Sequence, residues 1–365
     1  MKILMLLDNG YDPDVRVYKE AQYLVSKGID VTILCWDRDK GSTRLQDECI
    51  DGVHILRIRI PSQYGSGKKQ LSAYIKFAFT CRSYMQKHQY DFIHCHDLGC
   101  AVIGCIARNR RIPYIFDMHE YYEKSAPLRK NNIHALIIYL INHSYASLYE
   151  NDIYLDPAYS SVHSKLYPLK NYPDSRLIKR NPKKETNVFR IGYHGSVRNQ
   201  IDQFSALFEA VKGLSDVRVD INGSGIDLPQ LYQLEKKYDN VHINGPFNGT
   251  TALTNLYQNT HVLFCGYDRN DPNMQGTAEI VKYFEAILTG TPMIAAESLA
   301  VGIRVKKYGF GLAVDTDSAD AIRTAILKLK NDHNFWQQCS ENELAQAWKY
   351  DWNEAVKILD KVYSL

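Results

Sequence analysis

The sequence predicts an α/β protein built from two doubly wound, Rossmann-like domains with parallel sheets. Three observations support this class. The chain has 365 residues, which is more than one hydrophobic core usually accommodates. Short apolar runs alternate with helical patterns in both halves of the chain, which is typical of parallel β-α-β units. A polar, basic segment at residues 179–187 separates the two alternating series.

The first series begins with a strand over Lys2–Leu7 and a helix over Val15–Lys27 that ends at Gly28, a common helix stop. Later strands are expected at residues 31–36, 53–60, 92–96 and 114–117, with helices over 71–88 and 101–108. From residue 120 to residue 172 the pattern is mostly helical and aromatic, without a clear strand before Tyr154.

The second series is expected to contain strands at residues 189–193, 217–222, 241–244, 261–265 and 292–295. The chain then divides into an amino-terminal domain over residues 1–178, a linker over 179–187, a second domain over 188–346 and a carboxyl-terminal helix over 347–365. We expect this last helix to pack back towards the first domain, although a plain terminal helix would explain its pattern equally well.

Composition excludes several classes of protein. The formal net charge is only +3, so the molecule as a whole is not a nucleic-acid-binding polycation. The apolar run Ile3–Leu7 is too short for a secretory signal, and no run reaches the roughly 20 apolar residues of a membrane-spanning helix. The eight cysteines include no C-x-x-C pair. We therefore expect a cytoplasmic protein with reduced cysteines.

Candidate ligand-binding residues follow the strands of the first domain, because ligands of open parallel sheets bind beyond the carboxyl ends of strands. Gly10 lies in the turn after the first strand, where an ordinary tight turn is an equally good interpretation. His119 follows another strand, although a lone histidine is more often structural. His94 and His96 can point to one side of their strand. Asp97 is expected to point elsewhere, so a third metal ligand is missing and we predict no metal site.

The second domain opens with a strand, a glycine turn and a helix, which together form an anion site from backbone N–H groups and the positive end of the helix. Gly195 and Ser196 lie in this turn, and Arg198 could add charge-assisted hydrogen bonds to a phosphate. Asn222 and Gly223 form a similar turn after the next strand. The alternative is a generic strand–helix turn with a surface arginine.

Residues 276–292 form the most informative segment. A helix is expected to begin near Thr277 and to end at Gly290, so that its amino end can face a diphosphate with Lys282 one turn further in. Glu285 lies on the same face of this helix and suits a ribose diol. The alternative is a Lys–Glu pair on a solvated helix face.

Taken in this order and spacing, the motifs make the chain similar to the retaining glycosyltransferases of family 4 (group 1 glycosyltransferases). That family has the GT-B fold, in which two Rossmann-like domains face each other across a cleft. The resemblance rests on residues 12–17, 20–21, 27–31, 94–98, 117–120, 192–196, 282–286 and 289–292, and on Trp352.

The resemblance implies that Glu285 binds the nucleotide ribose and that His119 contacts the transferred sugar. It implies further donor contacts at Gly10, Gly195, Ser196, Asn222, Gly223, Pro246, Phe247, Gly276, Thr277, Ala278 and Glu279. The family often has a second glutamate at the position of Thr277, and Glu279 is not equivalent to it. The family's phosphate-binding Arg and Lys pattern is also incomplete, because Ser196 and Ile201 occupy its positions; we expect Arg198 and Lys282 to replace it.

The activity implied by the resemblance is transfer of a hexose-type sugar from a UDP- or GDP-sugar to a glycan or lipid-linked acceptor, with retention and without a metal or other cofactor. His119, Arg198, Lys282 and Glu285 would then carry catalysis. Two alternatives remain. One is a nucleotide-sugar 2-epimerase of the same fold, and the other is a non-catalytic nucleotide-sugar-binding subunit of a glycan assembly complex.

An acceptor or membrane contact is expected on the first domain. Arg108, Arg110 and Arg111 form one basic cluster, and Arg129 and Lys130 precede the apolar stretch 133–141. A basic cluster beside an amphipathic helix suits peripheral binding to anionic lipid headgroups at the inner face of a membrane. A buried helix with solvated flanking charges is an equally good interpretation.

Overall fold

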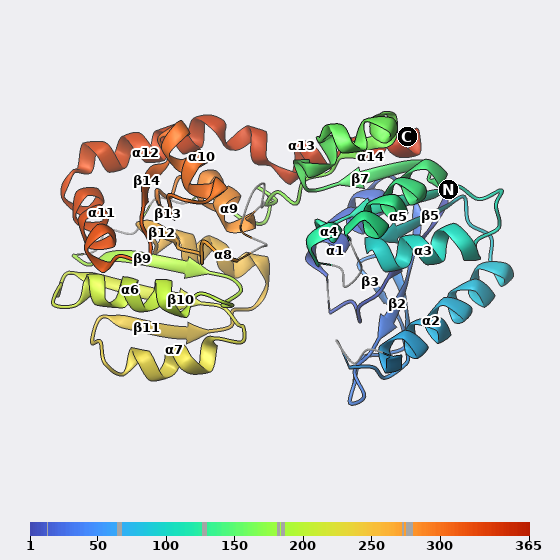
Figure 1. The fold of residues 1–365 in the computed structure, drawn as a ribbon, viewed down its shortest axis with the longest axis horizontal. Helices are drawn as coiled ribbons and strands as arrows, with labels where there is room; N and C mark the ends of the chain where they lie inside the picture. Colours follow the sequence, from blue (N-terminus) through green and yellow to red (C-terminus); the bar gives the residue numbers. More distant parts are fainter. Residues whose placement is uncertain are drawn as a thin grey trace. The chain divides into compact units, whose positions relative to one another are not determined.

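The computed structural model describes residues 1–12, 14–63, 68–125, 130–180, 183, 187–271, 274 and 280–365. The chain forms two compact units. The first unit comprises Met1–Lys170 and Val356–Leu365, and the second comprises Asn171–Ala355. Each unit is a sheet covered by helices (Figure 1).

The sheet of the first unit has eight strands in the order β3-β4-β2-β1-β5-β6-β7-β8. All neighbouring strands are parallel except β3 and β4. The strands are β1 Lys2–Leu7, β2 Asp30–Asp37, β3 Asp47–Ile50, β4 Val53–Arg59, β5 Phe92–His96, β6 Tyr114–Met118, β7 Ala146–Tyr149 and β8 Leu166–Pro168.

Helices connect these strands as β-α-β units require. They are α1 Val15–Ser26, α2 Lys68–Lys87, α3 Asp97–Ala107, α4 Tyr122–Ser125 and α5 Lys130–His143, followed by the 3-10 helices η1 Asp152–Leu155 and η2 Pro157–Lys165, and by α14 Ile358–Tyr363. Asp14 caps α1 by accepting a hydrogen bond from the backbone N–H of Val17. The sheet order reverses at β1 and β5, and this is where a ligand site is expected in a doubly wound sheet.

The second unit has a six-stranded parallel sheet in the order β11-β10-β9-β12-β13-β14. Its strands are β9 Phe189–His194, β10 Val217–Asn222, β11 Val241–Gly245, β12 Val262–Cys265, β13 Met293–Ala296 and β14 Gly311–Val314. Its helices are α6 Ile201–Val211, α7 Leu228–Glu235, α8 Gly249–Gln258, α9 Val281–Thr289, α10 Ala300–Tyr308, α11 Ala319–Asn331, α12 His333–Gln346, η3 Ala347–Tyr350 and α13 Trp352–Ala355.

The predicted class, two doubly wound α/β sheets, is confirmed. Four strands were missed. β3 lies in the polar stretch between the strands expected at residues 31–36 and 53–60. β7 and β8 lie in the stretch that we expected to be helical, and β14 lies beyond the last expected strand. β7 is four residues long and fully buried, so it lacks the alternation of apolar and polar residues that identifies a half-buried strand.

The segment around the expected linker packs into the second unit. Ile178 is buried in its core, and the backbone N–H of Lys179 donates to the Thr254 hydroxyl at 3.1 Å. At the other end of the chain, Val356–Leu365 belongs to the first unit, where the Tyr23 hydroxyl donates to Asp360 at 2.8 Å. Among the helices that the structure describes, none combines the length and apolar character needed to cross a bilayer.

Candidate functional site

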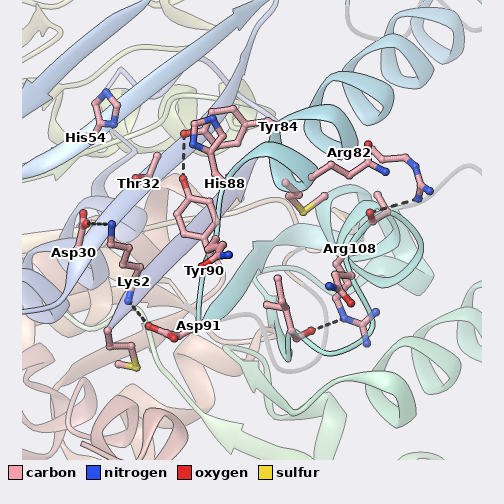
Figure 2. Close-up of a pocket in the computed structure, with 17 residues that line it drawn as sticks. Lys2, Asp30, Thr32, His54, Arg82, Tyr84, His88, Tyr90, Asp91 and Arg108 are labelled. Atoms are coloured by element: carbon pink, nitrogen blue, oxygen red, sulfur yellow. Dashed lines mark hydrogen bonds and ion pairs between the residues drawn. The ribbon is translucent and has the colours of Figure 1, made fainter.

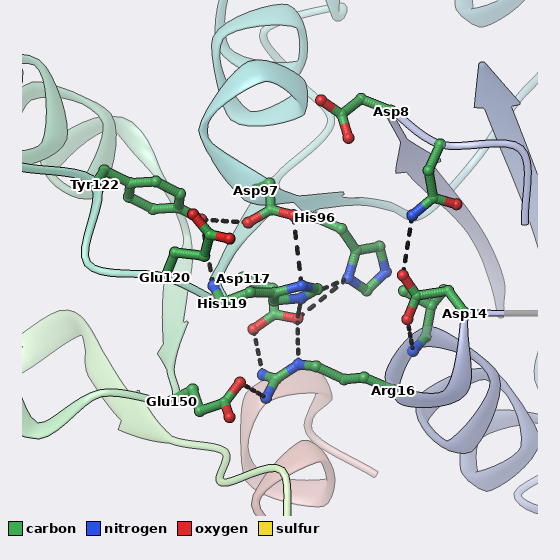
Figure 3. Close-up of polar contacts among 12 residues, drawn as sticks. Asp8, Asp14, Arg16, His96, Asp97, Asp117, His119, Glu120, Tyr122 and Glu150 are labelled. Carbon is green, nitrogen blue, oxygen red and sulfur yellow. Dashed lines mark hydrogen bonds and ion pairs between the residues drawn. The ribbon is translucent and has the colours of Figure 1, made fainter. Parts of the chain in front are cut away.

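His119 lies directly after β6, at the carboxyl edge of the first sheet (Figure 3). Its Nε2 donates to Asp117 Oδ2 at 2.6 Å, and its Nδ1 lies 3.5 Å from Asp97 Oδ2. Burial alone lowers the pKa of His119, but the charges of Asp97 and Asp117 outweigh burial and raise the pKa to about 10. His119 is therefore an imidazolium cation at neutral pH and cannot act there as a general base.

Asp97 corrects one expectation from the sequence. We expected its side chain to point away from the histidines, as it would in a regular strand, but Asp97 follows the last residue of β5 and has a φ of 66°. This left-handed conformation turns its carboxylate towards His119 (Figure 3). The Tyr122 hydroxyl links the two residues, because it donates to Asp97 at 2.6 Å and accepts from the His119 backbone N–H at 3.2 Å.

Arg16 on α1 supplies the buried positive charge of this cluster. Its Nη2 lies 2.7 Å from Asp117 Oδ1, its Nη1 3.0 Å from Glu150 Oε2, and its Nε 3.2 Å from Glu20 Oε1. Burial alone would raise the pKa of Asp117, but Arg16 and His119 lower it well below its usual range. The ionised Asp117 carboxylate therefore accepts hydrogen bonds from both cations.

A second layer of groups behind Asp117 is neutral. Burial lowers the pKa values of His94 and His96, that of His96 to about 3. Burial and the charge of Asp117 raise the pKa of Glu20 well above its usual range. The ligand atoms of Glu20, His94, His96 and Asp117 lie within 4.8 Å of one another, which would allow a metal ion. The Arg16 guanidinium lies against both Glu20 and Asp117, at 3.2 and 2.7 Å, and its charge disfavours a metal ion beside it. The absence of a metal stays a prediction.

Residues from the end of the chain also reach this cluster. The Tyr363 hydroxyl on α14 lies 2.7 Å from His94 Nδ1, and the His94 ring stacks on His96 with centroids 4.4 Å apart. Sequence reasoning named neither Tyr363 nor Arg16 as a site residue. Each lies on a helix whose spacing shows only which face is buried, and the partner strands had to be placed before their role became apparent.

Gly10 lies in the loop after β1, beside a cavity of about 420 Å³ lined by this loop and the end of β2. Arg57 on β4 holds the loop, because its Nε donates to the Gly10 carbonyl at 2.9 Å and its Nη2 donates to the Tyr11 carbonyl at 3.1 Å. A Cβ at Gly10 would lie 3.4 Å from the Asp37 carboxylate. The loop is therefore packed closely and carries its backbone towards the cavity.

The basic cluster at the end of α3 lies at the opposite edge of the first sheet. Arg108 belongs to a pocket of about 1240 Å³ at the amino ends of β1 and β2 (Figure 2). It donates to the carbonyls of Cys105 and Ile112 at 2.7 and 2.9 Å, and its guanidinium lies 4.6 Å from the Tyr114 ring centroid. Arg108 thus closes the end of α3 and is not brought near His119. In the same pocket Lys2 Nζ lies 3.7 Å from Asp30 Oδ2, and the Lys2 backbone N–H donates to Asp91 at 2.7 Å.

The apolar stretch expected at a membrane is part of the core. On α5 the residues Ile133, Ile137, Leu140 and Ile141 are all buried. The alternative interpretation, a buried helix, is therefore correct for this segment. Arg129 lies outside the described residues, as does the side chain of Lys130.

The second unit has a cavity of about 320 Å³ at the carboxyl edge of its sheet, and part of the predicted set lines it. The cavity is lined by Gly195, Ser196, Arg198, Phe247, Lys282 and Glu285, together with residues that we did not predict, among them His194, Tyr267 and Met274. Pro246 is exposed and precedes Phe247. Gly276, Thr277, Ala278 and Glu279 lie outside the described residues.

Helix α9 begins later than expected. Ile280 is its extended N-cap, so the helix starts at Val281 and not near Thr277. Lys282 therefore lies in the first turn, where the positive end of the helix dipole favours an anion. Gly290 ends the helix at φ 62°, as predicted.

Lys282 and Glu285 are both buried, so the alternative of a solvated ion pair is wrong. Lys282 Nζ lies 3.6 Å from the Tyr193 ring centroid and 5.4 Å from that of Tyr267. Glu285 Oε2 accepts a hydrogen bond from the Tyr257 hydroxyl at 2.9 Å. The two charged groups turn to different partners while both line the cavity.

The glycine turns after β9 and β10 pack against each other. The N–H of Gly195 donates to the Asn222 carbonyl at 2.9 Å, and that of Gly223 donates to the Gly245 carbonyl at 2.7 Å. A Cβ at Gly223 would lie 1.8 Å from the Gly195 carbonyl oxygen. The N–H groups of Gly195 and Gly223 therefore already donate to backbone carbonyls and are not available to a ligand. Gly223 has no side chain, which allows the two loops to approach each other closely.

The amino end of α6 and the Asn222 side chain also have internal partners. The N–H of Gln200 donates to Asp227 at 2.9 Å, so a carboxylate already caps α6. The Asn222 amide lies 3.2 Å from His194 Nδ1, and burial together with the charge of Lys282 lowers the pKa of His194 to about 3. The N–H of Gln200 is therefore already used, while Gly195, Ser196 and Arg198 line the same cavity as Lys282.

Residues 13–148 match the family model of the glycosyl transferase 4-like domain. This part of the chain is a glycosyltransferase 4-like domain. It contains Arg16, Asp97, Asp117 and His119, while the cavity with Lys282 and Glu285 lies beyond it.

Curated relatives share short regions with the chain. The probable sucrose-phosphate synthase 2 of Craterostigma plantagineum is 27% identical over 128 residues, which are 35% of this chain and 9% of the relative. The probable sucrose-phosphate synthase 2 of Oryza sativa subsp. japonica is 34% identical over 77 residues, which are 21% of this chain and 8% of the relative. The chain matches less than a tenth of the length of either relative.

Solved structures resemble the whole chain. Sucrose-phosphate synthase from Thermosynechococcus elongatus superposes with a TM-score of 0.75 at 15% identity, covering 100% of this chain and 98% of that one. HepE from Anabaena in complex with UDP and glucose superposes with a TM-score of 0.69 at 17% identity, covering 100% of both chains. These likenesses establish that the glycosyltransferase 4-like domain is part of a GT-B fold.

The first prediction concerns the buried ion pair of the glycosyltransferase 4-like domain. Arg16→Met should lower the free energy of unfolding by about 3–5 kcal/mol, because it leaves the Asp117 charge buried without its main partner. Lys212→Met is the matched control, since it removes one partner of an exposed pair with Glu209 and should cost at most about 1 kcal/mol. Urea unfolding followed by circular dichroism measures both. Equal decreases in the free energy of unfolding for the two variants would show that the buried Arg16 pair stabilises the fold no more than an exposed pair does.

The second prediction concerns the charge of His119. Asp97→Asn should lower the pKa of His119 from about 10, because one of the two carboxylates that stabilise the imidazolium is lost. In the unchanged protein, the raised pKa of His119 stabilises the folded state. This contribution has its full size below pH 6.5, the ordinary pKa of histidine, and is lost as the pH rises through about 10. NMR titration of the His119 ring measures the pKa.

Asp91→Asn, at the opposite edge of the sheet, is the control and should leave this pKa unchanged. An ordinary His119 pKa in the unchanged protein would contradict the electrostatic account, as would a pKa that Asp97→Asn does not move.

Proposed function

We propose that the protein is a retaining glycosyltransferase that moves a hexose-type sugar from a nucleoside-diphosphate sugar to an acceptor. The observation that carries the proposal is the cavity of the second unit, where Lys282 in the first turn of α9 and the carboxylate of Glu285 line the same space. A cation with a helix amino end suits a diphosphate, and a buried carboxylate suits a ribose diol.

The chemistry of the leaving group explains why positive charge is needed. Cleavage of the bond between sugar and diphosphate leaves negative charge on the phosphate oxygens, and fixed positive groups stabilise that charge. In the part of the chain that the structure describes, neither Lys282 nor Arg198 is paired with a carboxylate. We therefore assign to them, and to the amino end of α9, the role of binding the departing diphosphate without a metal.

The donor is proposed to be a UDP-hexose. HepE, which shares the GT-B fold, has been solved with UDP and with UDP-glucose. Phe247 lines the cavity directly after the sharp turn at Gly245, where an aromatic face and loop backbone suit a nucleobase. GDP remains the alternative base, as expected from the resemblance.

His119 is proposed to contact the transferred sugar as a hydrogen-bond donor. Its positive charge rules out proton abstraction at neutral pH, so the acceptor proton must go elsewhere. We propose front-face attack, in which a donor phosphate oxygen takes that proton and configuration is retained. The acceptor is proposed to be a glycan or a lipid-linked glycan.

The third prediction tests the diphosphate site. Lys282→Met should weaken UDP binding about tenfold or more, because a charge-assisted contact to phosphate contributes about 1.5–3 kcal/mol. Methionine keeps the packing between Tyr193 and Tyr267 while it removes the charge. Lys306→Met on α10 is the control and should leave the affinity unchanged. Isothermal titration calorimetry measures both. Unchanged UDP affinity in Lys282→Met would remove Lys282 from the site.

The fourth prediction tests the reaction itself. With a UDP-hexose and a panel of glycan acceptors, UDP release should depend on acceptor, persist in the presence of a metal chelator, and yield a product of retained configuration by NMR. Glu285→Ala and Arg198→Ala should each lower kcat/KM about tenfold or more. Full activity in both variants would overturn these roles. Conversion of the donor sugar alone would indicate the epimerase, and binding without turnover across the panel would indicate the non-catalytic subunit.

A further inference from the structure

Helix α2 carries two apolar faces, and only one of them is used by the fold. Its core face packs through Ala73, Phe77, Cys81 and Met85, all of which are buried. On the other side, Leu71, Ile75 and Phe79 are 57%, 46% and 67% exposed. Residues spaced by four lie on one face of a helix, so these three side chains form a continuous stripe that points away from the core.

The charges around this stripe all have one sign. Between residues 68 and 87 the helix contains five basic residues and no acidic one, and the exposed basic residues include Lys69, Lys76, Arg82 and Lys87. Lys69, Lys76 and Lys87 fall on the solvent side next to the apolar stripe at helical spacing. An exposed helix is ordinarily polar with both signs of charge, so this composition points to a partner that is apolar within and negative at its surface.

The end of α3 extends the same surface. Arg82 donates to the carbonyl of Ala107 at 3.5 Å, which places the last turn of α3 beside the second half of α2. Ile106 in that turn is 67% exposed, and Arg110 and Arg111, which follow, are exposed as well. Exposed apolar residues elsewhere in the described chain are mostly single, as on an ordinary protein surface.

We infer that this surface, formed by Leu71, Ile75, Phe79 and Ile106 with the flanking basic residues, docks onto an anionic lipid bilayer. The apolar side chains enter the boundary between headgroups and acyl chains, and the lysines and arginines contact the negative headgroups. The surface replaces α5 as the membrane contact, because the apolar residues of α5 are buried. The inference concerns the first unit alone and does not depend on the proposed transfer reaction.

Co-sedimentation of the full chain with phospholipid vesicles tests the inference. The protein should bind vesicles of phosphatidylcholine mixed with phosphatidylglycerol, should bind phosphatidylcholine alone at least about tenfold more weakly, and should be released by high salt. The triple variant Leu71→Gln, Ile75→Gln, Phe79→Gln should lower the partition coefficient at least about tenfold. The charge variant Lys69→Gln, Lys76→Gln, Lys87→Gln should do the same.

The matched control is the triple variant Ile303→Gln, Lys306→Gln, Lys307→Gln on α10, which removes an exposed apolar residue and two basic ones from the second unit. It should bind the anionic vesicles as the unchanged protein does. All variants should retain the affinity for UDP, which separates loss of membrane binding from loss of the donor site. A Phe79→Trp variant adds a direct readout, because its added fluorescence should shift to the blue with anionic vesicles while that of Ile303→Trp should not.

Failure to bind anionic vesicles at low salt would overturn the inference, as would a glutamine variant of α2 that binds like the unchanged protein. Light scattering tests the alternative that a second copy of this chain, and not a membrane, binds the stripe. If the unchanged protein is a dimer that the Leu71, Ile75 and Phe79 variant dissociates, the stripe is an interface between copies of this chain and the membrane assignment is wrong.

Discussion

The buried ion pair between Arg16 and Asp117 is the constraint on which the site of the first unit depends. The two residues come from α1 and β6, which are far apart in sequence, and they meet at 2.7 Å with almost no exposure to solvent. A charge at this depth requires its partner, so the pair fixes where α1 lies against the sheet. Because Asp117 stays ionised, it can also accept a hydrogen bond from His119, and Asp97 completes the stabilisation of that cation. The raised pKa of His119 thus depends on Asp97 and on the ionised Asp117, while the charge of Arg16 by itself acts in the opposite direction.

The second unit stabilises its cation in a different way. Lys282 lies against the faces of Tyr193 and Tyr267, whose electron-rich rings attract the ammonium group without neutralising it. A carboxylate partner would have offset the positive charge of Lys282 and weakened its attraction for the proposed phosphate ligand. The glycine turn at Gly195 is shaped around the same side chain, since a Cβ there would lie 3.3 Å from Lys282 Cε. Under the proposed function, this arrangement would let Lys282 serve where Ser196 and Ile201 stand in place of phosphate-binding residues.

The sequence could place those candidate residues whose position follows from element boundaries alone. His119, Lys282 and Glu285 were predicted because each lies at a strand end or on the buried face of a helix, and both features are visible in the spacing of apolar residues. Asp97 was missed because its position depends on a single backbone angle, a φ of 66°, which an aspartate adopts only rarely. β7 was missed because a strand buried on both faces carries no periodic signal. Sequence spacing also could not show that Asp227, distant in sequence, accepts a hydrogen bond from the N–H of Gln200 at the amino end of α6.

Helices α2 and α5 show why an apolar pattern by itself cannot assign a membrane contact. Both carry apolar residues at helical spacing, and α5 has the more continuous apolar run. The core uses the apolar residues Ile133, Ile137, Leu140 and Ile141 of α5, whereas on α2 it uses one face and leaves Leu71, Ile75 and Phe79 in water. These three side chains stay 57%, 46% and 67% exposed, so folding removes only part of their apolar surface from water and stabilises the unit correspondingly little. The remaining exposed apolar surface of α2 and the uniform positive charge around it are the two observations on which the proposed membrane contact rests.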